Sequence, residues 1–419
     1  MQSIRGTKDI LPNEITLWQY IYSQAKNTLK LYNYHEIRTP ILESTSLFHR
    51  SIGNDTDIIN KEMYSFKDQG LRELTLRPEG TASIARAFIN HKMHSTNNTK
   101  KLWYFGPMFR YERPQQGRQR QFHQLGVECI GSINPIADAE VIRLAVKLLE
   151  NLQCTDFNLE INSIGNVSER IKYKNHLIDY LNHYKEDLDT ESQKRLDTNP
   201  LRILDSKVNK TQEIISQAPK LISFLNLESE KHFNELCQHL TDMNITYSIN
   251  PYLIRGLDYY NYTAFEIKNQ LSKQQNTICG GGRYDYLIEQ LGGPQTPAVG
   301  WAIGIERLII EINKNIKIKQ NSPIYISIQG QNINHKIWHI ITMMEEQKIN
   351  FEFDVTGANL NKQIKKAYSM NIKILLIIGE EEIKYNYIIF KWLQTNKQKF
   401  VHMKHLQNYL YYIKQFLRT

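Results

Sequence analysis

The sequence has little of what marks secreted, membrane or metal-binding proteins. It contains only four cysteines in 419 residues, Cys129, Cys154, Cys237 and Cys279, and no CxxC pair. Cysteines so few and so far apart exclude a disulfide framework and a zinc-ligand spacing, and they favour a reducing compartment. The longest strongly apolar run, Ile374 to Ile378, is much shorter than the roughly 20 residues that cross a bilayer.

The first residues, Met1 to Leu11, are polar and lack the apolar stretch of a secretory signal. We therefore expect a cytoplasmic protein without membrane association. Hydrophobic residues make up 41% of the chain and charged residues 23%, which excludes disorder as the main state. At roughly 100–200 residues per domain, the length predicts two to four domains.

Several common catalytic motifs are also absent. The sequence has no GxGxxG, P-loop, HExxH or GxSxG motif. These absences exclude a Rossmann dinucleotide site, a Walker-type ATPase, a zinc protease and an α/β-hydrolase. The 13 histidines show no metal-ligand spacing, so we expect no metal site built from protein side chains.

The net charge of +9 is concentrated toward the C-terminus. Residues 322–419 hold 13 Lys or Arg and 7 Asp or Glu, which accounts for most of the excess. A basic protein favours a polyanionic partner, but charge alone does not identify it.

Apolar periodicity and turn residues predict the elements of the first three quarters of the chain. Helices are expected over 14–35, 81–88, 136–150 and 301–312. Strands are expected over 102–105, 109–112, 121–128, 247–267 and 276–280.

In the last quarter, strands and helices alternate. Strands are expected over 324–328, 351–355, 372–378 and 385–392, and helices over 333–346, 361–370 and 405–417. This alternation predicts a small α/β domain with a largely parallel sheet.

Composition divides the chain further. Residues 165–245 are charged and helical in pattern, which indicates an inserted helical module. Residues 313–322 are rich in lysine, and a proline follows them, which is typical of a linker. We therefore expect a catalytic core in two parts (1–164 and 246–320), a helical insertion (165–245) and a C-terminal domain (321–419).

The segment 109–124 holds the densest group of chemically active side chains. Two predicted strands would present Arg110 and Glu112 on one face, and Phe122 and Gln124 on the same side of the neighbouring strand. A charged hairpin is most often an exposed, salt-bridged turn. Four arginines within 11 residues, around a Pro and a Gly, nevertheless suit bidentate phosphate binding better.

Three further segments are candidates for a site. In 253–261, Leu-Ile-Arg-Gly-Leu-Asp-Tyr-Tyr-Asn would by itself be an ordinary surface turn. In 279–285, three consecutive glycines permit close approach of a ligand or another backbone, or form a flexible hairpin tip. In 300–308, small residues would let a helix pack closely, and Arg307 either caps that helix or projects into a site.

Taken together, these segments resemble the histidyl-tRNA synthetases of bacterial type, which are class II aminoacyl-tRNA synthetases. The 109–124 segment is similar to class II motif 2 and the 300–308 segment to motif 3. The 253–261 and 279–285 segments are similar to the histidine-specific signatures. The resemblance also covers 4–9 with Pro12, 36–40, 76–81 and 162–165.

The resemblance implies an α+β fold. Its core would be the class II antiparallel sheet flanked by helices, with a helical insertion and a C-terminal α/β anticodon-binding domain. Residues 36–40 resemble motif 1, which lies at the dimer interface in the family and implies a homodimer.

The resemblance also implies a ligase. ATP and L-histidine would give histidyl-adenylate, and the histidyl group would then pass to the 3′ end of tRNA-His. Mg²⁺ would accompany ATP. Neither step needs a covalent enzyme intermediate, so positioning and charge stabilisation would carry the rate.

Residue roles follow from the same resemblance. The catalytic groups would be Arg255 and Arg110, with Arg110 at the α-phosphate and Arg307 at the γ-phosphate. The ATP-binding residues would be Arg110, Glu112, Arg118, Phe122 and Arg307, with Phe122 stacked on adenine. The histidine-binding residues would be Glu79, Gly80, Thr81, Arg110, Gln124, Glu128, Arg255, Tyr259, Tyr260 and Tyr284. The tRNA acceptor end would contact Gln115 and Gln116.

Selection of histidine has a physical basis. Neutral imidazole has one donor and one acceptor nitrogen. Glu128 would accept from the ring N–H, and the Tyr260 hydroxyl would satisfy the other nitrogen. Such a site discriminates by about 10⁴–10⁵-fold without editing, because a wrong ligand leaves buried polar groups unpaired.

Gln116, Tyr262 and Tyr286 depart from the common pattern of the family, which affects the expected acceptor-stem contacts. Three alternatives stay open at this point. They are a non-catalytic regulatory subunit of histidine biosynthesis, a class II synthetase for Gly, Pro or Thr, and a simple basic RNA-binding protein. Regulators of the first kind lose motif residues and the C-terminal domain, whereas this chain carries both.

Overall fold

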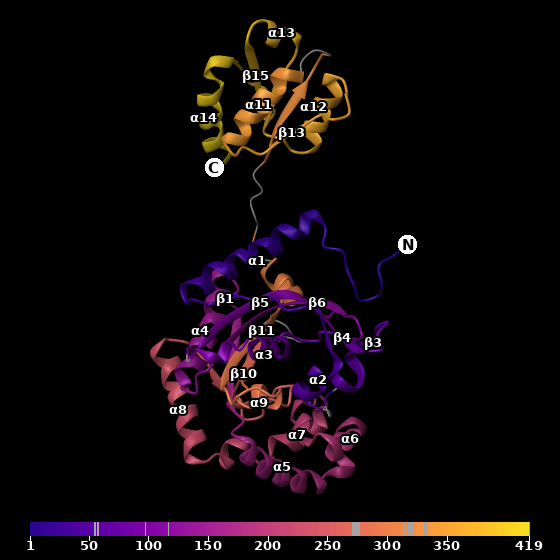
Figure 1. Cartoon of the computed structure of the whole chain (residues 1–419), viewed down its shortest axis with the longest axis vertical. Coiled ribbons are helices and arrows are strands. Elements are labelled where there is room, and N and C mark those ends of the chain that lie inside the picture. The colour runs from indigo at the N-terminus through magenta and orange to yellow at the C-terminus, as the bar shows by residue number, and fades with distance from the viewer. Residues whose placement is uncertain are drawn as a thin grey trace. The chain divides into compact units, whose positions relative to one another are not determined.

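The structure is a computed structural model that describes residues 1–53, 56, 58–96, 98–115, 117–269, 277–313, 316, 322–330 and 334–418. The chain divides into two compact units, Met1–Lys317 and Ile318–Thr419 (Figure 1). Each unit has hydrophobic clusters of its own. The finer division with limits at 164, 245 and 320 stays a prediction.

The first unit is built on an eight-stranded sheet with the order β1-β5-β6-β11-β10-β9-β7-β8. Neighbouring strands are antiparallel except for the two outer pairs, β1 with β5 and β7 with β8. The strands are β1 (His35–Glu36), β5 (Lys100–Phe109), β6 (Gln121–Ile130), β7 (Phe157–Ser163), β8 (Ser248–Ile249), β9 (Asn261–Asn269), β10 (Thr277–Arg283) and β11 (Ala298–Gly304).

Along the central strands, apolar core residues alternate with polar or small residues, and this alternation distinguishes the two faces of the sheet. On β6, Leu125 and Val127 point into the main core, where helices α1 (Pro12–Leu31), α4 (Pro135–Asn151) and α8 (Leu227–Asp242) cover one face. The intervening Gln124, Gly126 and Glu128 point to the other face. On β11, Trp301 and Ile303 are core residues, whereas Gly300, Ala302 and Gly304 alternate with them. The second face is therefore free to form a site.

A smaller sheet and short helices border that second face. The sheet has the order β2 (Leu42–Ser44), β4 (Glu73–Leu76) and β3 (Tyr64–Lys67). The helical segments are α2 (Thr45–Ile52), η1 (Ile58–Glu62), α3 (Thr81–Asn90), η2 (Met93–Ser95) and α9 (Leu287–Gln290), whereas α10 (Ile305–Ile312) packs into the main core on the first face.

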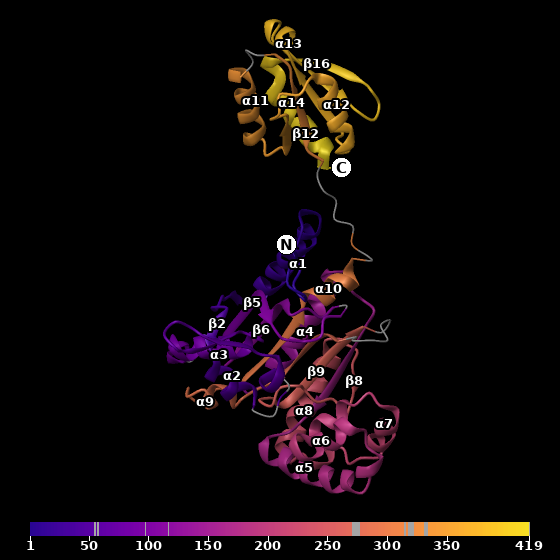
Figure 2. The same cartoon turned by 90° about the vertical axis from the view of Figure 1, so that its right-hand side faces the viewer.

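The expected helical insertion is present between β7 and β8 (Figure 2). Asn166 and Glu169 form a reciprocal capping box that begins its first helix. Its segments are α5 (Val167–Asn182), η3 (Lys185–Asp187), α6 (Thr190–Thr198), η4 (Pro200–Asp205), α7 (Asn209–Ser216), η5 (Leu221–Phe224) and α8.

The second unit has a five-stranded sheet with the order β13-β12-β14-β15-β16. Its strands are β12 (Ile324–Ile328), β13 (Phe351–Phe353), β14 (Ile374–Ile378), β15 (Tyr387–Trp392) and β16 (Gln398–His402). Its helical segments are α11 (Asn334–Glu346), α12 (Leu360–Ser369), α13 (Glu380–Lys384), η6 (Met403–His405) and α14 (Leu406–Arg418).

The prediction of a largely parallel sheet in this unit is half wrong. Strands β13, β12 and β14 are parallel, but β15 and β16 pair antiparallel. The turn that joins β15 to β16 is too short for the crossover that a parallel pair needs. The sequence prediction missed both β16 and α13.

Four other element predictions need correction. Residues 301–304 belong to β11, so the helix begins only at Ile305. Residues 102–109 form one strand that ends at Phe109, and Arg110–Glu112 lie beyond it. Residues 250–260 are a loop, and the three glycines at 280–282 lie inside β10 and not at a hairpin tip. The predicted linker 313–322 falls mostly outside the described residues.

Within the described part of the chain, none of the helices has the length and apolar character that crossing a bilayer requires.

Candidate active site

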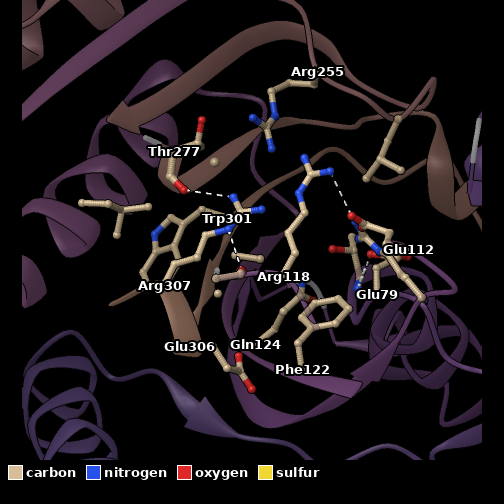
Figure 3. Close-up of a pocket in the computed structure, with 18 of the residues that line it drawn as sticks. Glu79, Glu112, Arg118, Phe122, Gln124, Arg255, Thr277, Trp301, Glu306 and Arg307 are labelled. Atoms are coloured by element: carbon tan, nitrogen blue, oxygen red, sulfur yellow. Dashed lines mark hydrogen bonds and ion pairs between the residues drawn. The ribbon is translucent and has the colours of Figure 1, made fainter. Parts of the chain in front are cut away.

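A cavity of about 190 Å³ opens on the free face of the eight-stranded sheet (Figure 3). Strands β6, β10 and β11 form its floor, and the 110–119 and 253–260 segments form its walls. It brings together eleven of the predicted site residues, namely Glu79, Thr81, Arg110, Glu112, Arg118, Phe122, Gln124, Arg255, Tyr259, Tyr260 and Arg307. Gly80, Gln115, Glu128 and Tyr284 are not part of the lining.

The arginine segment 110–119 forms one wall. Arg118 Nη1 lies 3.0 Å from Glu112 Oε2. Arg110 donates from Nε to the Pro78 carbonyl oxygen at 2.9 Å, and its guanidinium carbon lies 5.3 Å from the Phe122 ring centroid. The segment thus offers guanidinium donors beside an aromatic face, a combination that suits a nucleotide.

Gln115 and Arg118 pair through their backbones, at 3.1 and 2.9 Å, which closes the turn of this segment. Gln116, the other residue predicted to contact the tRNA acceptor end, lies outside the described residues.

Arg307 projects into the site and does not cap helix α10. It donates from Nε to the Gly117 carbonyl oxygen at 3.1 Å and from Nη1 to that of Thr277 at 3.2 Å (Figure 3). Burial, followed by repulsion from Arg118, lowers the pKa of the Arg307 guanidinium. This corner of the cavity therefore carries surplus positive charge, which an anionic ligand would neutralise.

Arg255 reaches the cavity from the loop before β9. Its Nη1 pairs with Glu266 Oε1. The other oxygen of this carboxylate, Oε2, accepts from Thr277 Oγ1 at 3.1 Å. Glu266 on β9 lies opposite Gly280 on β10, and a Cβ atom at Gly280 would stand 2.3 Å from the guanidinium. Burial opposes the charge of Arg255, but Glu266 outweighs it, and the pKa of Arg255 is raised.

Glu79 lies where helix α3 begins. Its carboxylate accepts from the backbone N–H groups of Thr81 and Ala82 at 2.8 and 2.7 Å. These bonds satisfy donors that a helix N-terminus leaves free. Burial still raises the pKa of Glu79 above its ordinary value.

Glu128 is buried behind the cavity lining. Thr81 Oγ1 donates to it at 2.8 Å, and the Tyr284 hydroxyl donates to its other oxygen. Burial raises the pKa of Glu128 to about 8, and the two hydrogen bonds only partly offset this effect. A carboxyl group held near neutrality in this way can accept or donate a hydrogen bond to a polar ligand.

Some buried polar atoms around this group find no hydrogen-bond partner among the described residues. They are the Tyr104 and Tyr259 hydroxyls, Gln124 Oε1 and Arg255 Nε. Buried polar groups are normally paired, so these atoms indicate a polar ligand or water in the cavity.

Sequence reasoning assigned no role to several residues at the site. Trp301 and Glu306 line the cavity, and Tyr104 and Glu266 lie directly behind the lining. Glu306 accepts from the His123 backbone N–H at 2.9 Å, which fixes the start of α10 against β6. Trp301 and Glu306 lie in the 300–308 segment that resembles motif 3, whereas Tyr104 and Glu266 reach the site only through strand pairing between distant segments.

Within the described ranges, no group of three or more His, Cys, Asp or Glu side chains is arranged to hold a metal ion.

Comparisons with known proteins match one family over nearly the whole chain. A family model described as histidyl-tRNA synthetase matches residues 6–308, and one described as an anticodon binding domain matches residues 314–411. The chain is 60% identical over 400 residues to the chloroplastic histidine–tRNA ligase of Gracilaria tenuistipitata var. liui, covering 95% of both proteins. It is 48% identical to histidine–tRNA ligase from Acaryochloris marina, covering 97% of this chain and 95% of that protein.

A solved structure supports the same assignment. Apo histidyl-tRNA synthetase from S. aureus superposes with a TM-score of 0.82 at 35% identity, covering 98% of this chain and 100% of that one. The two-unit α+β architecture agrees with these matches. The chain belongs to the histidyl-tRNA synthetase family.

Proposed function

We propose that the cavity activates L-histidine with ATP and that the protein then transfers the histidyl group to the 3′ end of tRNA-His. The observation that carries this proposal is a cavity that has a cationic wall and borders on a buried carboxyl–tyrosine cluster. The wall (Arg110, Arg118 and Arg307) suits a triphosphate. The cluster suits a small polar substrate with a donor and an acceptor.

In the first step, a carboxylate oxygen of histidine attacks the α-phosphorus of ATP. The bond from that phosphorus to the bridging oxygen breaks, and pyrophosphate leaves with the electron pair. Arg110 and Arg255 would stabilise the charge that builds on the phosphorus oxygens. Phe122 would stack on adenine, and Glu112, Arg118 and Arg307 would hold the remainder of the nucleotide as its Mg²⁺ complex.

In the second step, the terminal ribose hydroxyl of the tRNA attacks the histidyl carbonyl carbon, and AMP leaves. Gln115 and Gln116 are proposed to contact the acceptor end. The second unit, which matches an anticodon-binding model and holds most of the excess charge, is proposed to bind the anticodon arm.

Selection of histidine is assigned to the buried cluster. Glu128 would bind one imidazole nitrogen and the Tyr260 hydroxyl the other, while Tyr259 and Tyr284 shape the space around the ring. Glu79, Gly80, Thr81 and Gln124 would bind the amino and carboxylate groups. The free Gln124 Oε1 and Tyr259 hydroxyl support a polar ligand at this end.

The decisive experiment is ATP–pyrophosphate exchange with each amino acid in turn. We expect exchange with histidine only. Arg255→Ala should lose at least about a hundredfold in rate, because removal of one preorganised donor to a developing charge costs that much. Absence of exchange by the wild type would contradict the proposal.

The regulatory-subunit alternative is not favoured. The matched relatives named above are ligases over nearly the whole length of this chain, and the C-terminal unit is present.

We also propose a homodimer formed through residues 36–40. Strand β1 is the edge of the large sheet, and the neighbouring Ile41 and Leu42 are exposed apolar residues. Sedimentation velocity would show a single species of twice the chain mass, and a monomer at all concentrations would contradict the dimer.

Two compartments are candidates. The sequence favours the cytoplasm, whereas the Gracilaria relative is named as chloroplastic. We propose a compartment whose translation is of bacterial type, in agreement with the Acaryochloris relative. Fractionation of the source cells, with an antibody to this chain, would distinguish the cytoplasm from the chloroplast.

A further inference from the structure

A second cavity, of about 260 Å³, lies between the helical insertion and the 253–260 loop. Among its lining residues, the insertion contributes Arg170, Lys174 and Arg202, and the loop contributes Arg255, Leu257 and Asp258. Arg255 and Leu257 also line the active-site cavity. The loop is therefore a thin partition with the candidate active site on one side and the insertion on the other.

Two arginines of the insertion hold the backbone of this loop. Arg202, in η4, donates from Nη2 to the Gly256 carbonyl oxygen at 2.9 Å. Arg170, in α5, donates from Nη1 to the carbonyl oxygens of Asp258 and Tyr260 at 3.2 and 2.5 Å. Carbonyl groups at every second residue thus face the insertion, while the Tyr259 and Tyr260 side chains line the active-site cavity.

The loop sequence is adapted to this contact. A Cβ atom at Gly256 would stand 2.8 Å from Arg202 Nη2, so a larger residue there would push the guanidinium away from the carbonyl oxygen. The position of Arg170 disfavours its positive charge, since burial lowers the pKa of its guanidinium. A buried cation needs hydrogen-bond acceptors, and the two loop carbonyl oxygens supply them.

We propose that Arg170 and Arg202 are positioning residues through which the helical insertion fixes the 253–260 loop, and with it Arg255, for histidine activation. This inference rests on the proposed function and adds a regulatory element to it. Any movement of the insertion relative to the sheet would displace Arg255, so the insertion would act on catalysis through the 253–260 loop.

The test compares Arg202→Met and Arg170→Met with the wild type, all as full-length protein. Methionine keeps most of the stem volume and removes the donors. Amide hydrogen exchange in the 253–260 peptide should become at least about tenfold faster. The kcat of histidine-dependent pyrophosphate exchange should fall by about tenfold to a hundredfold, the cost of a small misplacement of a catalytic group. The KM for ATP should change little, because Arg110, Arg118 and Arg307 are untouched.

Two further variants make the test specific. Arg202→Lys keeps a charged donor and should recover part of the lost kcat. Lys174→Met removes a cation from the same cavity but leaves the hydrogen bonds of Arg170 and Arg202 to the loop intact. It should leave amide hydrogen exchange in the loop and kcat unchanged. An equal loss in Lys174→Met would overturn the proposal and indicate an anion site in the second cavity instead.

A double-variant cycle shows whether the effect passes through Arg255. If it does, Arg202→Met should add little to the loss already caused by Arg255→Ala. Independent, multiplicative losses would overturn the proposal, as would unchanged loop exchange in both arginine variants. If the wild type exchanges no pyrophosphate, the proposed function fails, but the hydrogen-exchange measurement still decides whether these arginines hold the loop.

Discussion

At the residue scale, Glu128 lies in surroundings very different from those of an ordinary surface carboxylate. It is almost fully buried, and its two oxygens accept from Thr81 and Tyr284. With a pKa raised from 4.5 to about 8, it is mostly protonated at neutral pH in the ligand-free protein. A histidine ring that donates to Glu128 would favour its charged form, so binding of histidine should release a proton.

This raised pKa predicts a pH dependence of stability. Below pH 4.5 the group is protonated in both the folded and the unfolded chain, and its contribution to stability is fully present. As pH rises toward 8, the unfolded chain gives up this proton while the folded protein retains it, so stability falls. The fall should be on the order of a few kcal/mol, since a tenfold change in proton affinity is worth about 1.4 kcal/mol.

Glu128→Gln should remove that part of the slope. Urea unfolding of the ligand-free protein between pH 5 and pH 8 measures it. Glu160→Gln, which removes a carboxylate that pairs with Lys268 on the same sheet, is the control. Equal slopes in the wild type and Glu128→Gln would show that Glu128 is ionised in the folded protein.

At the element scale, strand β10 explains why a run of glycines lies in the middle of a sheet. Each glycine leaves room for a different neighbour. A Cβ at Gly280 would stand 2.3 Å from the Arg255 guanidinium, whereas a Cβ at Gly281 would stand 2.2 Å from the Gly300 carbonyl oxygen. The first neighbour is the end of a long side chain, and the second is the backbone of the paired strand β11.

The two glycines should therefore respond differently to alanine. Gly280→Ala should stay folded but lose about tenfold or more in pyrophosphate exchange, because Arg255 is displaced. Gly281→Ala should lose about 1–3 kcal/mol or more of stability, since backbone cannot move aside as a side chain can. Thermal unfolding and exchange rates, measured on both variants, distinguish these outcomes. A similar loss of stability in both would contradict the distinction.

The insertion is the other element with a role beyond packing. Its Arg170 and Arg202 donate to loop carbonyl oxygens on the far side of the active-site partition. Helix propensity alone would make 165–245 a solvent-exposed module. These contacts make it part of the support of the catalytic loop.

At the scale of the whole molecule, the chain has two units with separate cores. The first contains the cavity, and the second carries much of the positive charge. Activation needs only ATP and histidine, whereas charging also needs the tRNA. The two reactions should therefore depend differently on the second unit.

A chain that stops after Gln320 should keep histidine-dependent pyrophosphate exchange. Its affinity for tRNA-His should fall by at least about tenfold, which corresponds to about 1.4 kcal/mol of lost contacts. Filter binding at several salt concentrations measures this. The full chain should show the steeper salt dependence, because each phosphate contact that is lost lowers the slope. Equal affinity and slope would exclude a role of the second unit in binding RNA.

Much of the site could be predicted from the sequence because its functional side chains lie within a few short segments. The arginines at 110 and 118, the aromatic Phe122, and Arg255, Tyr259 and Tyr260 each stand within a local motif, and all of them line one cavity. The helices at 81–88 and 136–150 and the insertion were predicted correctly because helical periodicity is local. The strand at 301–304 was missed because it runs directly into the apolar helix α10, and periodicity does not separate so short an apolar strand from a helix.

By itself, the sequence determined which functional groups this protein has, the fold class and the family to which it belongs. Only the tertiary structure decided which groups meet. Glu266 pairs with Arg255 because antiparallel register sets it opposite Gly280, and Thr81 meets Glu128 because α3 begins above β6. The hydrogen bonds from Arg170 and Arg202 to the loop carbonyl oxygens likewise depend on how the insertion packs against the loop. The physical reason is that strand register and packing bring together residues that lie far apart in the chain. The local periodicity of the sequence does not indicate which of these residues come into contact.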